Sequence, residues 1–120
     1  MPLTAPPIPF IRRRRPRLPT AAPPPAAISV VSVTANGFEL TWTFSAAVTL
    51  MAGNVPELEN DVDGTGLWQS PSGCVQGGAD QIIATYPDQP GEASPWRIAS
   101  PPSNIQQAAQ ITVPQSGQVG

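Results

Sequence analysis

The side chains best suited to binding a charged partner form one short run near the N-terminus. Five of the six basic residues fall within six positions: Arg12, Arg13, Arg14, Arg15 and Arg17. The guanidinium group is a planar fork of donors that binds carboxylates and phosphates in a bidentate manner. The run predicts docking onto an acidic protein surface, with nucleic-acid binding and an inert, solubilising run as alternatives.

Acidic side chains gather in a second stretch, where their alternation resembles the first half of a calcium-binding loop. Four of them precede Gly64: Glu57, Glu59, Asp61 and Asp63. An EF-hand loop needs a bidentate glutamate at its twelfth position, which is Ser70 when Glu59 is counted as the first. We therefore predict a solvated acidic loop and no metal, and a weaker calcium site of another kind stays open as an alternative.

Residue types that perform acid–base and nucleophilic chemistry are scarce. The chain has no histidine, which removes the usual general base, the Ser-His-Asp and Cys-His systems and the commonest zinc ligand. Its single cysteine, Cys74, cannot form an intrachain disulfide, and Arg97 is the only cation outside the N-terminal run that could lower its thiol pKa. We predict an inert thiol, no catalytic residue, no cofactor and no enzymatic activity.

The three tryptophans could pack in a core or present a flat surface to a ligand. Trp42 alternates with polar residues on a predicted strand and is expected in the core. Trp68 and Trp96 lie in turn-rich segments, beside Gln69 and Arg97 respectively. We take these two as a candidate surface platform, the alternative being packing at the ends of the domain.

Charge and proline content divide the chain in two. Residues 1–25 carry five arginines and no acid, whereas residues 26–120 hold one basic and eight acidic residues, a net charge of +1 − 8 = −7. Residues 1–27 also contain nine of the seventeen prolines. Proline fixes φ and lacks an N–H group, so this segment predicts an extended arm. Phe10, Ile11 and Leu18 are spaced as apolar anchors and complete, with the arginine run, the predicted partner-binding set.

Targeting signals are not evident. No apolar run approaches the roughly 18 residues of a membrane span. The N-terminus also lacks the apolar core of a secretory signal. We therefore expect a soluble protein that does not associate with membranes and is made without Sec-type export.

Residues 28–114 predict short strands separated by turns. β-branched residues at 28–33 predict a first strand, and Asn36-Gly37 predicts a type I′ hairpin turn. The next strand alternates, with one face formed by Phe38, Leu40, Trp42 and Phe44. Further strands are predicted at residues 48–51, around Trp68, and at 81–86, 95–99 and 111–113.

Spacing of this kind favours a single small all-β sandwich over a βαβ arrangement. A helix of one or two turns could form only at residues 103–110, where an edge hairpin fits equally well. Residues 115–120 are polar and contain glycine, so we expect them to form a flexible C-terminal tail. The predicted division is therefore an arm at 1–27, a β-sandwich at 28–114 and a tail at 115–120.

Two features resemble known protein families. The sequence LTWTFSAAVTL at 40–50, followed by GNVPEL at 53–58, resembles an Ig-like module common in bacterial and phage surface proteins. The whole layout, a Pro/Arg-rich leader before one β domain, resembles small accessory proteins of phage and prophage virions. This resemblance implies an Ig-like sandwich in a structural protein that decorates a capsid or belongs to a tail. It also implies a virion location after assembly in the host cytoplasm, and docking through the arm onto shell or tail subunits in multiple symmetric copies.

Two other functions stay open at this point. An Ig-like domain could bind carbohydrate or a cell surface through Trp68, Trp96 and the acidic loop. The arm could instead bind nucleic acid, although the net charge of −7 on the body repels phosphate and no aromatic residue interleaves the arginines to stack on bases.

Overall fold

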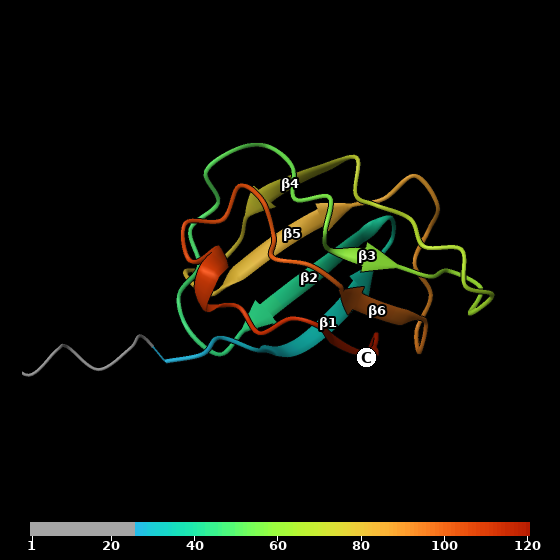
Figure 1. The fold of residues 1–120 in the computed structure, drawn as a ribbon. Helices are drawn as coiled ribbons and strands as arrows, with labels where there is room; N and C mark the ends of the chain where they lie inside the picture. The colour runs from blue at the N-terminus through green and yellow to red at the C-terminus, as the bar shows by residue number, and fades with distance from the viewer. Residues whose placement is uncertain (1–25) are drawn as a thin grey trace, which may run out of the picture.

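The computed structural model describes residues 26–120. Apart from its last two positions, the predicted arm lies outside the described residues, together with its arginine run and its apolar anchors Phe10, Ile11 and Leu18. The described chain forms two antiparallel sheets and one short 3₁₀ turn, so the prediction of a small all-β sandwich is confirmed (Figure 1). It contains no helix of the length and apolarity that crossing a membrane requires.

The two sheets have an immunoglobulin-type strand order. The first sheet has the order β1-β2-β5-β4, with β1 at Val30–Asn36, β2 at Glu39–Phe44, β5 at Gln81–Thr85 and β4 at Gly73–Gln76. The second has the order β3-β6-β7, with β3 at Glu59–Asn60, β6 at Pro95–Ile98 and β7 at Gln115–Gln118, and the 3₁₀ turn η1 at Ala108–Gln110 precedes β7. Lettered A to G along the chain, these are the ABED and CFG sheets of the constant-type immunoglobulin domain.

Strand β2 supplies the centre of the core because its side chains alternate between apolar and polar. Leu40, Trp42 and Phe44 are buried, whereas Thr41 and Thr43 between them are only partly covered. Ala84 and Ile82 of β5 pair with Leu40 and Trp42 and are also buried. The predicted inward face of this strand is therefore confirmed for its last three apolar residues.

The hairpin between β1 and β2 differs from the prediction by one residue. Asn36 pairs with Glu39, so the two loop residues are Gly37 and Phe38 rather than Asn36 and Gly37. Gly37 has φ +61°, and Phe38 does not have a positive φ, which is the pattern of a type II′ turn with glycine first. The shift places Phe38 in the turn, where it is 52% exposed, and not on the core face.

A tryptophan pair joins the two sheets. Trp42 on β2 meets Trp96 on β6 edge to face, with ring centroids 5.3 Å apart and an interplanar angle of 72°. In antibody domains the second and sixth strands are joined by a disulfide at this level of the fold. Trp42 Nε1 donates a hydrogen bond to Tyr86 Oη at 3.1 Å, and Tyr86 donates to the carbonyl of Leu58 at 2.6 Å. Both polar groups of this aromatic cluster are thus satisfied inside the core.

The last residues complete the second sheet, unlike the flexible tail expected at 115–120. Gln115–Gln118 form β7, which pairs with β6, and Val119 is buried. Gly120 N–H donates to the Val33 carbonyl at 2.8 Å, so the chain ends against β1. A polar, glycine-containing segment can take this place because its backbone bonds to β6 and only Val119 enters the core.

Other elements match the predictions in part. Strands β5 and β6 lie where strands were expected. The segments predicted as strands at 48–51 and 111–113 make only single bridges, Leu50 to Ile105 and Ile111 to Ile28, and the region around Trp68 makes one bridge through Gln69. Each of these segments pairs too briefly to form a ladder.

Candidate functional site

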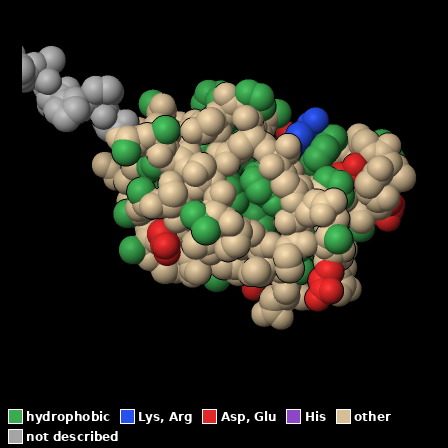
Figure 2. All heavy atoms as spheres, turned by 90° about the horizontal axis from the view of Figure 1, so that it is seen from below, with side chains coloured by type: hydrophobic (Ala, Val, Ile, Leu, Met, Phe, Trp, Pro, Cys, Tyr) green, Lys and Arg blue, Asp and Glu red, His purple; other side chains and the backbone are tan. Residues whose placement is uncertain are grey.

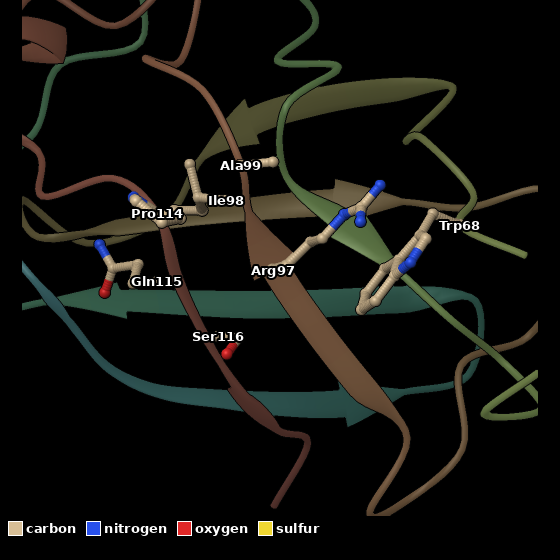
Figure 3. Close-up of a pocket in the computed structure, with 7 residues that line it drawn as sticks. All are labelled: Trp68, Arg97, Ile98, Ala99, Pro114, Gln115 and Ser116. Carbon is tan, nitrogen blue, oxygen red and sulfur yellow. The ribbon is translucent and has the colours of Figure 1, made fainter. Parts of the chain in front are cut away.

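A cleft of about 370 Å³ opens on the second sheet. It is lined by residues of β6 and β7, by the residue after β6 and the residue before β7, and by the loop after β3: Trp68, Arg97, Ile98, Ala99, Pro114, Gln115 and Ser116 (Figure 3). Along β6, Trp96 and Ile98 are buried and Arg97 is partly exposed, so the period of two aims Arg97 away from the core. The cleft contains a partly exposed aromatic residue, Trp68, and the one basic side chain of residues 26–120, and we treat it as the candidate site.

Arg97 organises the charged side of the cleft. Its Cζ lies 4.2 Å from the centroid of the Trp68 ring, so the guanidinium stacks on the indole (Figure 3). Its Nε and Nη2 each donate to a carboxylate oxygen of Glu59 at 3.3 Å. Glu59 and Arg97 are cross-strand partners on β3 and β6, which explains why the fork meets the carboxylate. Trp68 therefore has one face covered by a cation whose charge is largely balanced.

The opposite wall is apolar and held in place by Gln115. The Gln115 side chain accepts a hydrogen bond from Val30 N–H at 2.9 Å and donates to the Thr112 carbonyl at 2.8 Å. These bonds tie the wall to the start of β1 and leave Ile98, Ala99 and Pro114 as the apolar lining. Within the described residues the Ser116 hydroxyl makes no hydrogen bond, so it remains able to donate to a ligand.

The carboxylates of the acidic stretch bond to different parts of the fold. Asp61 is buried and accepts hydrogen bonds from Thr65 N–H at 3.2 Å and Gly66 N–H at 2.7 Å. Glu57 accepts from the backbone N–H and the hydroxyl of Ser103, and Glu59 bonds Arg97. Within residues 26–120 no three acidic, histidine or cysteine side chains lie close enough to hold a metal ion. These carboxylates fix their own loops and strands.

Charge is not concentrated around the cleft. Arg97 is the one basic side chain between residues 26 and 120, and the basic atoms visible in Figure 2 border hydrophobic atoms. The acidic side chains on the same face are scattered and do not form a single patch (Figure 2). Recognition in the cleft would therefore depend on shape, stacking and hydrogen bonding more than on net charge.

The structure separates the two tryptophans proposed as a surface platform. Trp68 is partly exposed in the cleft, as a platform requires. Trp96 is only 7% exposed and contacts Trp42, so its place in the platform is a wrong prediction. Trp96 points into the core because neighbouring residues of a strand face opposite sides of the sheet and Arg97 points outward. The turn-rich sequence around Trp96 gave no sign of this alternation.

Cys74 has the surroundings of an unreactive thiol. It is buried on β4, and its Sγ lies 3.7 Å from Asn54 Oδ1. Burial raises the pKa of the Cys74 thiol, and the backbone hydrogen bond that involves Val55 opposes this rise only in part. The thiolate is therefore disfavoured.

Sequence reasoning missed one wall of the cleft. Pro114, Gln115 and Ser116 were assigned to the end of the sandwich and a flexible tail, although they line the site. The available signal was the pair Trp68 and Arg97, a tryptophan in a turn-rich segment and the one basic residue of the body. What could not be read was which strand lies beside Arg97.

Comparison with known proteins identifies the fold. No family model and no curated protein sequence matches the chain. Two structures of the bacterial surface layer protein SbsC are similar to it. The structure of its domains 1–6 aligns with a TM-score of 0.57 and 15% identity, over 79% of this chain and 14% of that one. The structure of its N-terminal part aligns with a TM-score of 0.54 and 16% identity, over 78% of this chain and 24% of that one. The chain thus spans a small part of either protein, and the likeness is one of fold.

Proposed function

We propose that this chain is a non-catalytic structural module of a multi-copy protein assembly. In this proposal the sandwich is the body that is presented, and the basic, proline-rich arm is the element that docks. The observation that supports it most is the sandwich fold that the chain shares with domains of a surface layer protein. The use of Glu57, Glu59 and Asp61 to hold loops and strands together agrees with a structural role.

The finer proposal is a phage virion accessory protein, a decoration of the capsid or a tail component. Segregation of +5 on residues 1–25 from −7 on residues 26–120 suits an arm that leaves its own body and meets an acidic subunit surface. Repetition on a symmetric shell would add avidity to a weak single contact. Phe10, Ile11 and Leu18 would supply the apolar part of that contact.

The test is quantitative mass spectrometry of purified virions and of isolated cell-surface material from the same culture. We expect the chain in virions at a copy number that matches capsid or tail symmetry. Recovery in cell-surface material alone would overturn the virion proposal and keep the structural module. Absence from both fractions would overturn both.

The arm's part is tested separately by incorporation of variants. Replacing the five arginines by glutamine should reduce incorporation of the chain into particles. Replacing them by lysine keeps the charge and removes the planar fork, so this variant separates the contribution of charge from that of bidentate bonding. Equal incorporation of all three chains would show that the arm does not dock through its arginines. Binding of the wild-type chain to DNA that collapses between low and moderate salt would support the nucleic-acid alternative instead.

A carbohydrate-binding module is the second candidate, and the half-exposed Trp68 beside a cleft is the observation that favours it. Sugars stack on exposed indoles, but Arg97 already covers one face of this ring. Pull-down with insoluble cell-wall polysaccharide compares the wild-type chain with Trp68→Ala. Retention of the wild type alone would favour this candidate over docking through the arm.

A further inference from the structure

We infer that the cleft beside Trp68 receives the proline-rich arm of a second copy of this chain. The inference rests on the proposed function, because it names the partner of the docking arm. It follows from the chemistry of the cleft, the sequence of the arm and the point at which the arm joins the sandwich.

The cleft has the groups that recognise a polyproline II segment. Such a segment is a preformed helix without internal hydrogen bonds. Its prolyl rings therefore pack on flat apolar surfaces, and its carbonyl groups are free to accept hydrogen bonds from a partner. Trp68 and Pro114 provide the apolar surfaces. The Ser116 hydroxyl provides one donor, and the edge of the Arg97 guanidinium that does not bond Glu59 provides another.

The arm has the matching sequence twice. It contains Pro-x-x-Pro at residues 6–9 and again at 16–19. A polyproline II helix has three residues per turn, so the two prolines of each motif lie on one edge and can enter the same groove. The body holds one further Pro-x-x-Pro, at residues 87–90, but Pro90 is buried and the backbone of Asp88 bonds the Gln69 side chain, so this segment is not free to enter a groove of another copy.

The arm joins the sandwich beside the wall of the cleft. Ile28 N–H donates to the Gln110 carbonyl at 2.8 Å, and Val30 N–H donates to the side chain of the cleft residue Gln115 at 2.9 Å. The 25 residues before Ala26 could span up to about 78 Å at ~3.1 Å per residue, enough to reach a neighbouring molecule. Three consecutive prolines at 23–25 oppose a reversal at the exit, which favours the cleft of another copy over the chain's own.

Charge supports the same assignment. The arm of +5 is attracted to the body of another copy, which carries −7, whereas two bodies alone repel; this attraction brings the arm to the body, and shape, stacking and hydrogen bonding place it in the cleft. Each copy then donates one arm and accepts one, either reciprocally within a closed dimer or head-to-tail within a ring or a filament.

Sedimentation velocity of the full-length chain tests the inference. We expect association that strengthens with concentration and is weakened at least about tenfold by Trp68→Ala or Ala99→Arg, since a lost aromatic anchor or a filled cleft removes the main contact. Leu67→Ala is the matched control, because Leu67 is exposed beside Trp68 but does not line the cleft. Association that all four chains share, or a wild type that stays monomeric at millimolar concentration, would overturn the inference.

Mixing two full-length variants distinguishes a second copy from the chain's own arm. One variant is Trp68→Ala, with an intact arm and a defective cleft. The other has an intact cleft and serine at arm positions 6, 7, 9, 16 and 19 in place of proline. At a concentration where the wild type associates, each variant alone should associate at least about tenfold more weakly, and an equimolar mixture should form heterodimers. No heterodimer would overturn docking in trans, while incorporation of the chain into particles would still stand, so the two proposals fail separately.

Discussion

Gly117 is the residue that lets β7 approach the core. It pairs with Trp96 across the second sheet, and a Cβ at this position would lie 2.6 Å from Trp96 Cζ2 and 2.8 Å from Cε2. The indole cannot retreat easily, because its other side meets Trp42. Glycine is therefore needed here for space and not for an unusual backbone angle.

We expect Gly117→Ala to destabilise the sandwich by about 1–3 kcal/mol, the usual cost of overpacking a filled core. The urea midpoint of unfolding, followed by tryptophan fluorescence, measures the change. Gly91→Ala is the control, since a Cβ at Gly91 meets no atom within 4 Å. Equal midpoints for the two variants would mean that β7 shifts away from Trp96 at no cost.

Tyr86 couples the aromatic cluster to pH. Desolvation by burial raises the pKa of the Tyr86 phenol well above its ordinary value, and the hydrogen bond from Trp42 opposes this only in part. The folded state keeps the proton where the unfolded state releases it. Its contribution to stability is therefore complete below the unfolded pKa of about 10 and is lost as pH rises above that value.

The free energy of unfolding should fall by about 1.4 kcal/mol per pH unit above pH about 10 on account of Tyr86. Cys74, whose thiol pKa is also raised, adds a loss in the same direction that begins nearer pH 9. In Tyr86→Phe the tyrosine part of the slope should vanish. At neutral pH this variant should lose about 1–3 kcal/mol, because Leu58 O and Trp42 Nε1 lose their partner. Urea unfolding from pH 7 to 11 measures both effects, and parallel curves for the two proteins would contradict the assignment.

Strand β7 and the two residues after it close the sandwich. They pair with β6, bury Val119, bond β1 through Gly120 and supply one wall of the cleft. Such a segment contributes through its partners, because its own sequence has little strand propensity.

A chain that ends at Pro114 should fail to fold at 25 °C, since Trp96 loses its neighbour Gly117, the Val33 carbonyl loses its bond from Gly120 and β6 becomes an edge strand. Circular dichroism and near-ultraviolet tryptophan signals report the loss. The exposed substitution Gln118→Ala is the control and should keep the wild-type spectrum. A truncated chain with wild-type spectra would mean that the sandwich is complete without β7.

Elements with apolar alternation could be predicted, and those fixed by tertiary contacts could not. The pattern of β2 carries its own register, so Leu40, Trp42 and Phe44 were placed correctly. Strand β3 is two residues long, and its buried Asn60 is held by side-chain bonds to Ser94 Oγ and the Pro95 carbonyl. No local sequence pattern predicts a strand as short as β3. One side of the cleft could be predicted and the other could not. Trp68 was a candidate because it is a tryptophan in a turn-rich segment, whereas the position of Ser116 depends on the pairing of β7 with β6.

At the scale of the whole molecule, the division into a basic arm and an acidic body could be read from composition alone. The described body then adds what composition cannot give, a strand order, a cleft and the place where the arm is attached. Arg97 illustrates the difference. As a lone cation it suggested a partner for Cys74, and in the fold it stacks on Trp68 and bonds Glu59.

The pairing of the two chain ends has a mechanical consequence. Ile28 and Ile111 bridge in parallel, Val30 bonds Gln115, and Gly120 bonds Val33, so the first strand and the last segment run side by side in one direction. A force that pulled residues 26 and 120 apart would load these contacts together, in shear, and would not open them one after another. Resistance to force is set by the rate of unfolding and not by equilibrium stability. We therefore expect the sandwich to resist tension applied between residues 26 and 120 more strongly than tension applied across a single hairpin.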